Sequence, residues 1–111
     1  MKLGVTLHAT DLSMAVPDLA REAEARGFYS LYIPEHTHIP TSRRTPPPTG
    51  DAELSDEYLR SVDPYIALAG AAAVTDTIRL GTGIGLVAQH DPLTFAKQLA
   101  TLDHLSEGRL V

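Results

Sequence analysis

The chain has 111 residues, of which 43% are hydrophobic, and this allows one globular unit with a single hydrophobic core. Its formal net charge of −5 disfavours binding to nucleic-acid phosphates or to anionic membrane surfaces, so neither is an expected partner. The absence of cysteine excludes disulfides and thiolate chemistry, and no apolar run is long enough for a signal peptide or a membrane span, so a cytoplasmic protein is expected.

The first part of the sequence predicts a strand followed by a helix. Residues 3–7 are β-prone and lead toward Asp11 and Ser13, either of which is a suitable helix cap. The predicted helix spans residues 14–26, with an apolar face on one side, and Gly27 stands where a left-handed C-cap belongs. That apolar face consists of Leu19, Ala20 and Ala23.

A second apolar run, residues 31–33, predicts a strand that ends at Pro34. Residues 37–62 then hold many prolines and polar residues and predict a long loop, with a helical turn at residues 56–59. Loops longer than about 12–15 residues within a compact domain are usually functional lids or disordered. We therefore expect this segment to cover a site or to be poorly ordered.

The second half of the sequence contains the same helix-start motif twice. Asp63-Pro64 and Asp91-Pro92 each place an N-cap before a proline in the first turn, where the missing N–H costs nothing. They predict helices over residues 65–74 and 92–105, separated by a strand over residues 78–84 and followed by a strand at residues 109–111. The buried face of the last helix is predicted to consist of Leu93, Ala96, Leu99, Ala100 and Leu102.

This alternation of strands and helices predicts an α/β fold with a parallel sheet and right-handed connections. Periodicity alone does not separate an open doubly wound sheet from part of a barrel. No G-x-G-x-x-G motif follows the first strand, so the sequence offers no argument for a Rossmann dinucleotide site.

Four segments together resemble the luciferase-like monooxygenase superfamily: residues 27–36, residues 78–84, Asp91-Pro92 and residues 96–109. The amino-acid sequences of residues 35–40 and 56–59 are more similar to the coenzyme F420 branch than to the flavin mononucleotide (FMN) branch. The resemblance covers nearly the whole chain and implies that residues 1–111 form the N-terminal part, about strands one to four, of a TIM (β/α)8 barrel of about 250 residues. Strands five to eight, with the usual phosphate-binding region, would lie outside these residues.

The resemblance also implies a catalytic role for His36. This residue follows the second strand, at the rim where barrel enzymes place catalytic groups, and an imidazole can donate or accept the proton that accompanies hydride transfer. Glu35 is grouped with it at the cofactor site but is expected to point into the barrel wall as a structural carboxylate. His8 ends the first strand and is expected to tune the substrate pocket.

The segment after the third strand resembles the family's cofactor-backing bulge. By that resemblance a non-proline cis peptide bond joins Leu86 to Val87, and the bulge backs the cofactor ring; an ordinary glycine-rich strand exit is the alternative. The predicted cofactor-binding residues here are Gly85, Leu86, Val87 and Ala88.

Five histidines raise the question of a metal site. His36 and His38 share a loop with no fixed partner, and His8 lacks a second histidine two residues on, so no metal is expected. His104 is expected to be a solvated surface residue.

The resemblance implies an oxidoreductase that transfers a hydride between coenzyme F420 and a small organic substrate. One alternative is an FMN-dependent luciferase-like monooxygenase, and another is a non-catalytic, self-associating half-barrel. Three strands and the start of a fourth cannot close a sheet, so we also expect a homo-oligomer rather than a stable monomer. The open barrel face is expected to be apolar, with Val5, Leu7 or their neighbours and parts of residues 31–33 and 80–84 pointing inward.

Overall fold

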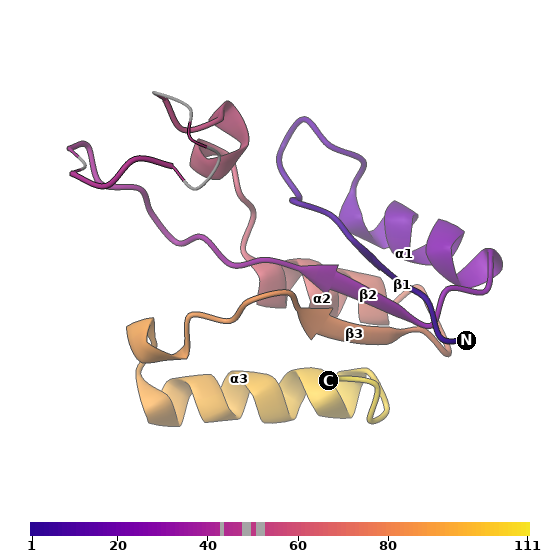
Figure 1. Ribbon diagram of the computed structural model, residues 1–111. Helices are drawn as coiled ribbons and strands as arrows, with labels where there is room; N and C mark the ends of the chain where they lie inside the picture. The colour runs from indigo at the N-terminus through magenta and orange to yellow at the C-terminus, as the bar shows by residue number, and fades with distance from the viewer. Residues whose placement is uncertain (43, 48–49, 51–52) are drawn as a thin grey trace.

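The computed structural model describes all residues except 43, 48, 49, 51 and 52. It consists of a parallel three-stranded sheet, in the order β1-β2-β3, with α-helices packed around it (Figure 1). The strands are β1 (Gly4–Thr6), β2 (Ser30–Ile33) and β3 (Arg79–Thr82). The α-helices are α1 (Val16–Ala25), α2 (Pro64–Ala72) and α3 (Pro92–Leu105), and the 3₁₀ turns are η1 (Asp56–Leu59) and η2 (Val87–Gln89). The predicted α/β class and parallel sheet are confirmed.

The end of the chain begins a fourth strand beside β3, as predicted. Leu110 forms a parallel bridge with Leu80. The Leu80 N–H donates to the Arg109 carbonyl at 3.0 Å, and the Val111 N–H donates to the Leu80 carbonyl at 2.9 Å. In the part of the chain that the structure describes, no helix is long and apolar enough to cross a membrane.

The predicted N-caps of α2 and α3 and the predicted glycine after α1 are present. The Asp63 carboxylate accepts from the Ile66 N–H at 2.9 Å, and the Asp91 carboxylate accepts from the Thr94 N–H at 2.8 Å. Gly27 follows α1 with φ of 77°, a conformation that favours glycine.

The predicted cap of α1 was wrong. The N-cap is Ala15, and no side chain bonds the first turn. The Ser13 hydroxyl instead accepts from the Thr10 N–H at 3.0 Å and so belongs to the turn before the helix. Because that turn holds Ser13 in place, the helix starts later than predicted.

The core lies between the sheet and the three α-helices. Val5, Leu31 and Leu80 lie side by side in register and point toward the helices. They pack into one apolar cluster whose other members include Ala20, Ala23, Ile33, Leu68, Ala71 and Leu102.

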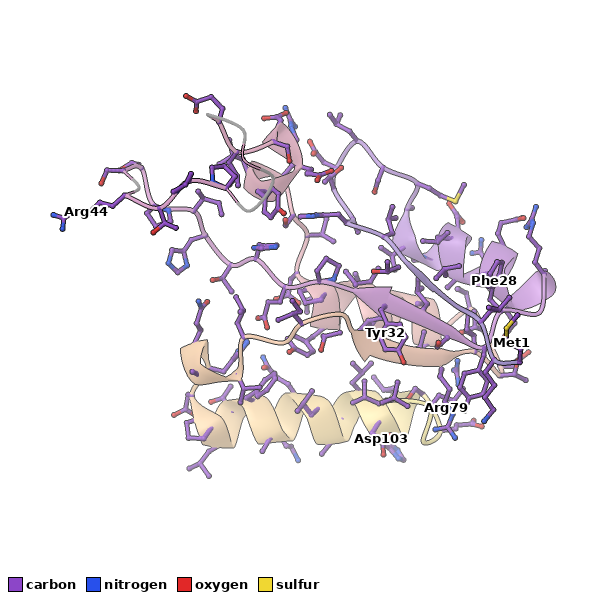
Figure 2. All side chains as sticks on the ribbon, in the orientation of Figure 1. Met1, Phe28, Tyr32, Arg44, Arg79 and Asp103 are labelled. Atoms are coloured by element: carbon purple, nitrogen blue, oxygen red, sulfur yellow. The ribbon has the colours of Figure 1, made fainter. Side chains whose placement is uncertain are left out.

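The opposite face of the sheet carries small and polar residues. Thr6, Tyr32 and Gly81 are neighbours on it, and a Cβ at Gly81 would come within 2.8 Å of the Tyr32 ring. Tyr32, labelled in Figure 2, therefore lies against the glycine of the next strand. Side chains alternate along a strand, so Val5 and Leu7 pack toward the helices, while their neighbour Thr6 and parts of the two expected ranges, Tyr32 and Gly81, lie on this face. The expectation that this face is apolar was wrong.

The predicted buried face of α3 was also largely wrong. Phe95 and Leu102 are buried, whereas Leu93 is 83% exposed. Ala96 and Ala100 are exposed too, and Leu99 is half-buried. Positions 95, 99, 102 and 106 recur at helical spacing on the side of α3 that packs on α2, so the prediction had mixed two adjacent faces of the helix.

Glu24 at the end of α1 holds the turn that leads into β3. Its Oε1 accepts hydrogen bonds from the backbone N–H groups of Asp76, Thr77 and Ile78 at 2.6–3.0 Å, and from the Thr77 hydroxyl at 3.0 Å. Burial would raise the pKa of the Glu24 carboxyl, but these hydrogen bonds outweigh burial and lower it.

A lowered pKa in the folded state means that Glu24 stabilises the fold above its unfolded-state pKa and that this contribution is lost as pH falls through the lowered value. We therefore expect Glu24→Gln to reduce the free energy of unfolding by about 1–2 kcal/mol at neutral pH, and the difference between the two proteins to disappear as pH falls through the lowered pKa of Glu24. Urea unfolding at a series of pH values from neutral to acidic measures this. A difference that stays constant with pH would contradict it.

Candidate functional site

The carboxyl ends of the three parallel strands meet at one edge of the sheet, at the left of Figure 1. His8 follows β1, His36 follows β2, and Leu86 and Val87 follow β3. The Glu35 N–H donates to the Ile84 carbonyl at 3.2 Å and joins the last two segments. His36 therefore lies at the same end of the sheet as Leu86 and Val87, as the parallel order of the strands implies.

Two histidines and a tyrosine form an aromatic group at this edge, which we call the imidazole cluster (His8, His36 and Tyr58). The two imidazole rings are stacked, with centroids 5.2 Å apart and planes 4° from parallel. Tyr58, from η1, packs edge-on to both rings at 4.9 and 4.8 Å. The loop predicted at residues 37–62 thus brings a side chain onto the histidines, and its predicted helical turn is confirmed.

The electrostatic surroundings of the two imidazoles differ. Burial, and then the electrostatic effect of the neighbouring His8, lower the pKa of His36, and only the more weakly acting Glu35 raises it. His36 is therefore neutral around neutral pH. The ring of His8 is held by polar groups instead, with Nε2 at 2.6 Å from the Ser61 hydroxyl and Nδ1 at 4.0 Å from a Glu57 carboxylate oxygen.

The Glu35 side chain is directed away from the imidazole cluster and into the protein, where it is 2% exposed. Its Oε2 accepts from the Leu86 N–H at 2.6 Å and from the Tyr65 hydroxyl at 3.3 Å. Its Oε1 lies 2.6 Å from Nε2 of His90. We call these four residues the Glu35 network. The expectation of a structural carboxylate is confirmed, and the network joins the exits of β2 and β3.

Tyr65 contributes a permanent donor to the Glu35 network. Burial, and then the negative charge of Glu35, raise the pKa of Tyr65 to about 12. The phenol therefore stays protonated at physiological pH and donates a hydrogen bond to the carboxylate.

The exit of β3 differs from the prediction in one respect. The described residues contain no cis peptide bond, so the predicted cis bond between Leu86 and Val87 was wrong. The chain turns instead through η2, where the Gln89 N–H donates to the Leu86 carbonyl at 2.8 Å. A trans peptide bond is favoured over a cis bond by several kcal/mol. This turn forms its backbone hydrogen bond while the peptide bonds stay trans. Ala88 lies within the turn and is exposed.

Apolar side chains at this exit remain open to solvent. Ile84 is 69% exposed and Val87 is 64% exposed, although both lie next to the polar site. Gly85 is tightly confined, because a Cβ there would lie 3.1 Å from the Thr82 hydroxyl and 3.2 Å from the Tyr65 hydroxyl.

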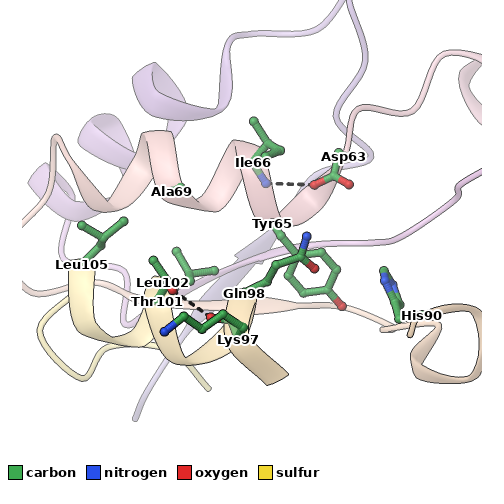
Figure 3. Close-up of a pocket in the computed structure, with 10 residues that line it drawn as sticks. All are labelled: Asp63, Tyr65, Ile66, Ala69, His90, Lys97, Gln98, Thr101, Leu102 and Leu105. Atoms are coloured by element: carbon green, nitrogen blue, oxygen red, sulfur yellow. Dashed lines mark hydrogen bonds between the residues drawn. The ribbon is translucent and has the colours of Figure 1, made fainter. Parts of the chain in front are cut away.

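A small cavity of about 190 Å³ opens beside His36. It is lined by Glu35, His36, Thr37, Ser61, Asp63 and Pro64. A groove of about 410 Å³ runs between α2 and α3 (Figure 3), with Leu105 at one end and with Tyr65 and His90 at the other. The cavity beside His36 is the candidate site, because it lies at the edge of the sheet where the strand ends bring polar groups together.

The remaining histidines lie apart from this site. The His38 side chain is exposed and its Nδ1 lies 2.8 Å from the Thr37 hydroxyl. His104 is exposed on α3, as predicted. Among the described residues, no three His, Cys, Asp or Glu side chains gather in a way that would hold a metal ion.

Sequence reasoning missed several members of the site. Ser61, Tyr65 and His90 had no predicted role, and Tyr58 was only part of a motif that favoured the F420 branch. A weak signal existed for two of them, since Tyr58 lies in the predicted turn at residues 56–59 and His90 directly precedes the Asp91 cap.

Comparison with known proteins agrees with this architecture. A family model described as luciferase-like monooxygenase matches residues 4–111. A relative from Mycobacterium bovis, itself named as uncharacterized, is 49% identical over 112 residues; the match covers 99% of this chain and 40% of the relative. The chain thus spans well under half the length of that protein.

Two solved structures share the fold. The coenzyme F420-dependent tetrahydromethanopterin reductase of Methanopyrus kandleri superposes with a TM-score of 0.72 at 26% identity, covering 99% of this chain and 25% of the reductase. The oxygenating constituent of 3,6-diketocamphane monooxygenase of Pseudomonas putida, in complex with FMN, superposes with a TM-score of 0.72 at 21% identity, covering 99% of this chain and 28% of that one. The parallel βα repeats are the N-terminal portion of the TIM-barrel fold of these proteins. The chain belongs to the luciferase-like monooxygenase family.

Proposed function

We propose that the protein transfers a hydride between coenzyme F420 and a small organic substrate, with His36 as the catalytic proton carrier. The observation that carries this proposal is the neutral, half-buried His36 imidazole at the carboxyl edge of the sheet, next to the exposed apolar exit of β3. The similarity to an F420-dependent reductase also supports it. The chain spans a minority of its relatives' length, so the proposal concerns the full-length protein.

The residues at this edge fit a flat, amphipathic ring. Ile84 and Val87 expose apolar side chains that such a ring would cover, while His36 and the backbone at Gly85 offer polar groups beside them. Ala88 would complete the contact surface, with Glu35 acting from behind through Leu86. The bound deazaflavin would supply or accept the hydride.

His36 would move the proton that accompanies the hydride. Within the described residues neither of its ring nitrogens has a hydrogen-bond partner in the protein, so both can reach a substrate oxygen. In the direction of substrate oxidation, neutral His36 would accept the hydroxyl proton on a ring nitrogen. His8 and Tyr58 would orient this ring and line the substrate pocket.

The alternative is an FMN-dependent monooxygenase, which the likeness to an FMN complex keeps open only at the level of the fold. Titration of the full-length protein with F420 and with FMN, followed by the absorbance of each ring, separates the two. We expect the lower dissociation constant for F420. A preference for FMN would establish the alternative, and no binding of either ring would contradict both and favour the non-catalytic half-barrel.

A pair of variants localises the binding surface. Val87→Asp places a charge where the apolar ring face is proposed to lie, and we expect it to weaken binding of the preferred cofactor by about tenfold or more, the equivalent of about 1.4 kcal/mol. Leu93→Asp is the matched control, since Leu93 is equally apolar and 83% exposed but lies on α3. Equal affinities for the two variants would contradict the proposed surface.

The expected homo-oligomer stays a prediction, for which light scattering is the measurement.

A further inference from the structure

We propose that His90 is a positioning residue, which acts through the buried Glu35 carboxylate to fix the backbone of the β3 exit at Gly85–Val87. This inference rests on the proposed function in one respect, because the β3 exit is the surface on which the cofactor ring is proposed to lie. It assigns a role to a histidine that does not itself reach the imidazole cluster.

The first argument is the burial of a carboxylate among donors. Glu35 is 2% exposed, and a buried carboxylate is costly unless hydrogen bonds and positive or polar partners satisfy it. Its two oxygens meet the Leu86 N–H at 2.6 Å, Nε2 of His90 at 2.6 Å and the Tyr65 hydroxyl at 3.3 Å. The two short contacts lie on different oxygens, so His90 on one side and Leu86 on the other define the orientation of the carboxylate plane.

The second argument is that His90 is itself held rigidly. Its ring stacks on Phe95 with centroids 4.1 Å apart and planes 12° from parallel, and Tyr65 packs edge-on to both rings. Phe95 is buried in α3, and the Asp91 cap fixes the start of that helix. The position of His90 is thus set by α2 and α3, and Glu35 transmits it to the strand exits.

The third argument is that the β3 exit is constrained at two consecutive residues. Glu35 fixes the N–H of Leu86, while Gly85 packs so closely on the Tyr65 hydroxyl that a Cβ would lie 3.2 Å from it. Both constraints come from members of the Glu35 network. Removal of the His90 contact frees the carboxylate to rotate and should loosen both.

Two substitutions separate the hydrogen bond of His90 from its packing. His90→Gln keeps an N–H donor near the position of Nε2, whereas His90→Asn is too short to reach Glu35. Both lose the ring that stacks on Phe95. A purely structural role of the ring predicts the same defect in both variants, whereas the positioning role predicts that the glutamine variant is rescued. His90 is 19% exposed, so neither change leaves a large cavity.

The first readout is independent of any cofactor. In a ¹⁵N–¹H spectrum of the full-length protein, the Leu86 amide proton should resonate far downfield because of its short bond to a carboxylate. We expect His90→Asn to move it upfield and to speed its exchange with solvent, and His90→Gln to restore both. An unchanged Leu86 signal in His90→Asn would overturn the inference.

The second readout is the dissociation constant for F420 and for FMN in the same proteins. We expect His90→Asn to weaken binding of the preferred ring by about tenfold, as for the loss of one hydrogen bond to a charged group, and His90→Gln to bind nearly as well as the wild type. His104→Asn, an exposed change on α3, is the control. If the Leu86 signal moves and affinity does not, His90 holds the β3 exit, and the proposal that the ring lies on this exit is wrong. If the wild type binds neither ring, the proposed function fails, and the Leu86 signal still reports whether His90 holds the β3 exit.

Discussion

Replacement of His36 by alanine is expected to lower the turnover of the full-length protein by about 10²-fold or more, as for the loss of a group that transfers a proton. The fold should survive, because His36 is half-buried and lies on a strand exit outside the core cluster. Steady-state kinetics with saturating cofactor measures the effect. His38→Ala is the matched control, since His38 lies two residues further in the same loop and is exposed.

The pH profile tests the same role in the wild type. Burial and the electrostatic effect of His8 lower the pKa of His36, so the neutral imidazole extends to more acidic pH than in a free histidine. If neutral His36 accepts the proton, the rate of substrate oxidation falls as pH drops through this lowered pKa, below the ordinary value of about 6.5. This acidic limb should vanish in His36→Ala. Unchanged turnover in that variant, with cofactor bound, would reduce His36 to a packing role.

Much of the fold could be predicted because its signals are local. Asp63-Pro64 and Asp91-Pro92 act within one helical turn, and Gly27 acts at a single dihedral angle, so each is visible in a few residues. The order of the elements then implies parallel strands. Parallel strands place the residues after each of them at one edge of the sheet, and the position of His36 beside the β3 exit followed from that rule alone.

The parts that could not be predicted depend on the direction of side chains. The α3 sequence contains two apolar faces, and only the packing of Phe95 and Leu102 against the rest of the chain selects one. In the same way, side chains alternate between the two faces of β1 and β2, and the local sequence does not say which face the helices cover. Turn geometry at Leu86 is set by Glu35, a residue 51 positions earlier, and so is absent from the local sequence.

The positions of the site residues at the strand ends were predicted, but the contacts between their side chains were not. His8 and His36 were each placed at a strand end, yet their stacking and the contribution of Tyr58 depend on how the loop between β2 and α2 folds back. His90 lies 55 positions from Glu35, and no spacing rule links them. Such contacts arise from tertiary structure, and the sequence contains only the residue types that make them possible.

Arg109→Met is expected to reduce the free energy of unfolding by about 3–5 kcal/mol, the largest stability effect of any single change considered for this protein. Arg109 is 9% exposed, and its guanidinium donates to four acceptors from three parts of the chain. These are the Ala72 carbonyl at 2.9 Å, the Thr75 hydroxyl at 2.8 Å, the Ile78 carbonyl at 3.3 Å and the Ser106 carbonyl at 2.7 Å.

The size of the effect follows from what methionine would leave behind. The side chain is similar in length and keeps most of the packing, so the loss isolates the hydrogen bonds rather than a cavity. The carbonyls at the ends of α2 and α3 would be buried without donors, and each such group costs about 1–3 kcal/mol. Arg109→Lys should recover only part of the loss, because an ammonium cannot reproduce the planar fork that reaches Ala72 and Ser106 together.

The measurement is urea unfolding of the full-length protein, followed by circular dichroism. Arg79→Met is the matched control, since Arg79 is half-buried and donates to a single carbonyl, that of Gly108, at 3.1 Å. We expect this control to cost less than about 1 kcal/mol. Similar losses for the two variants would show that the four bonds of Arg109 do not act together. The contact between α2, α3 and the C-terminal segment that bridges to β3 at Leu110 would then depend on apolar packing alone.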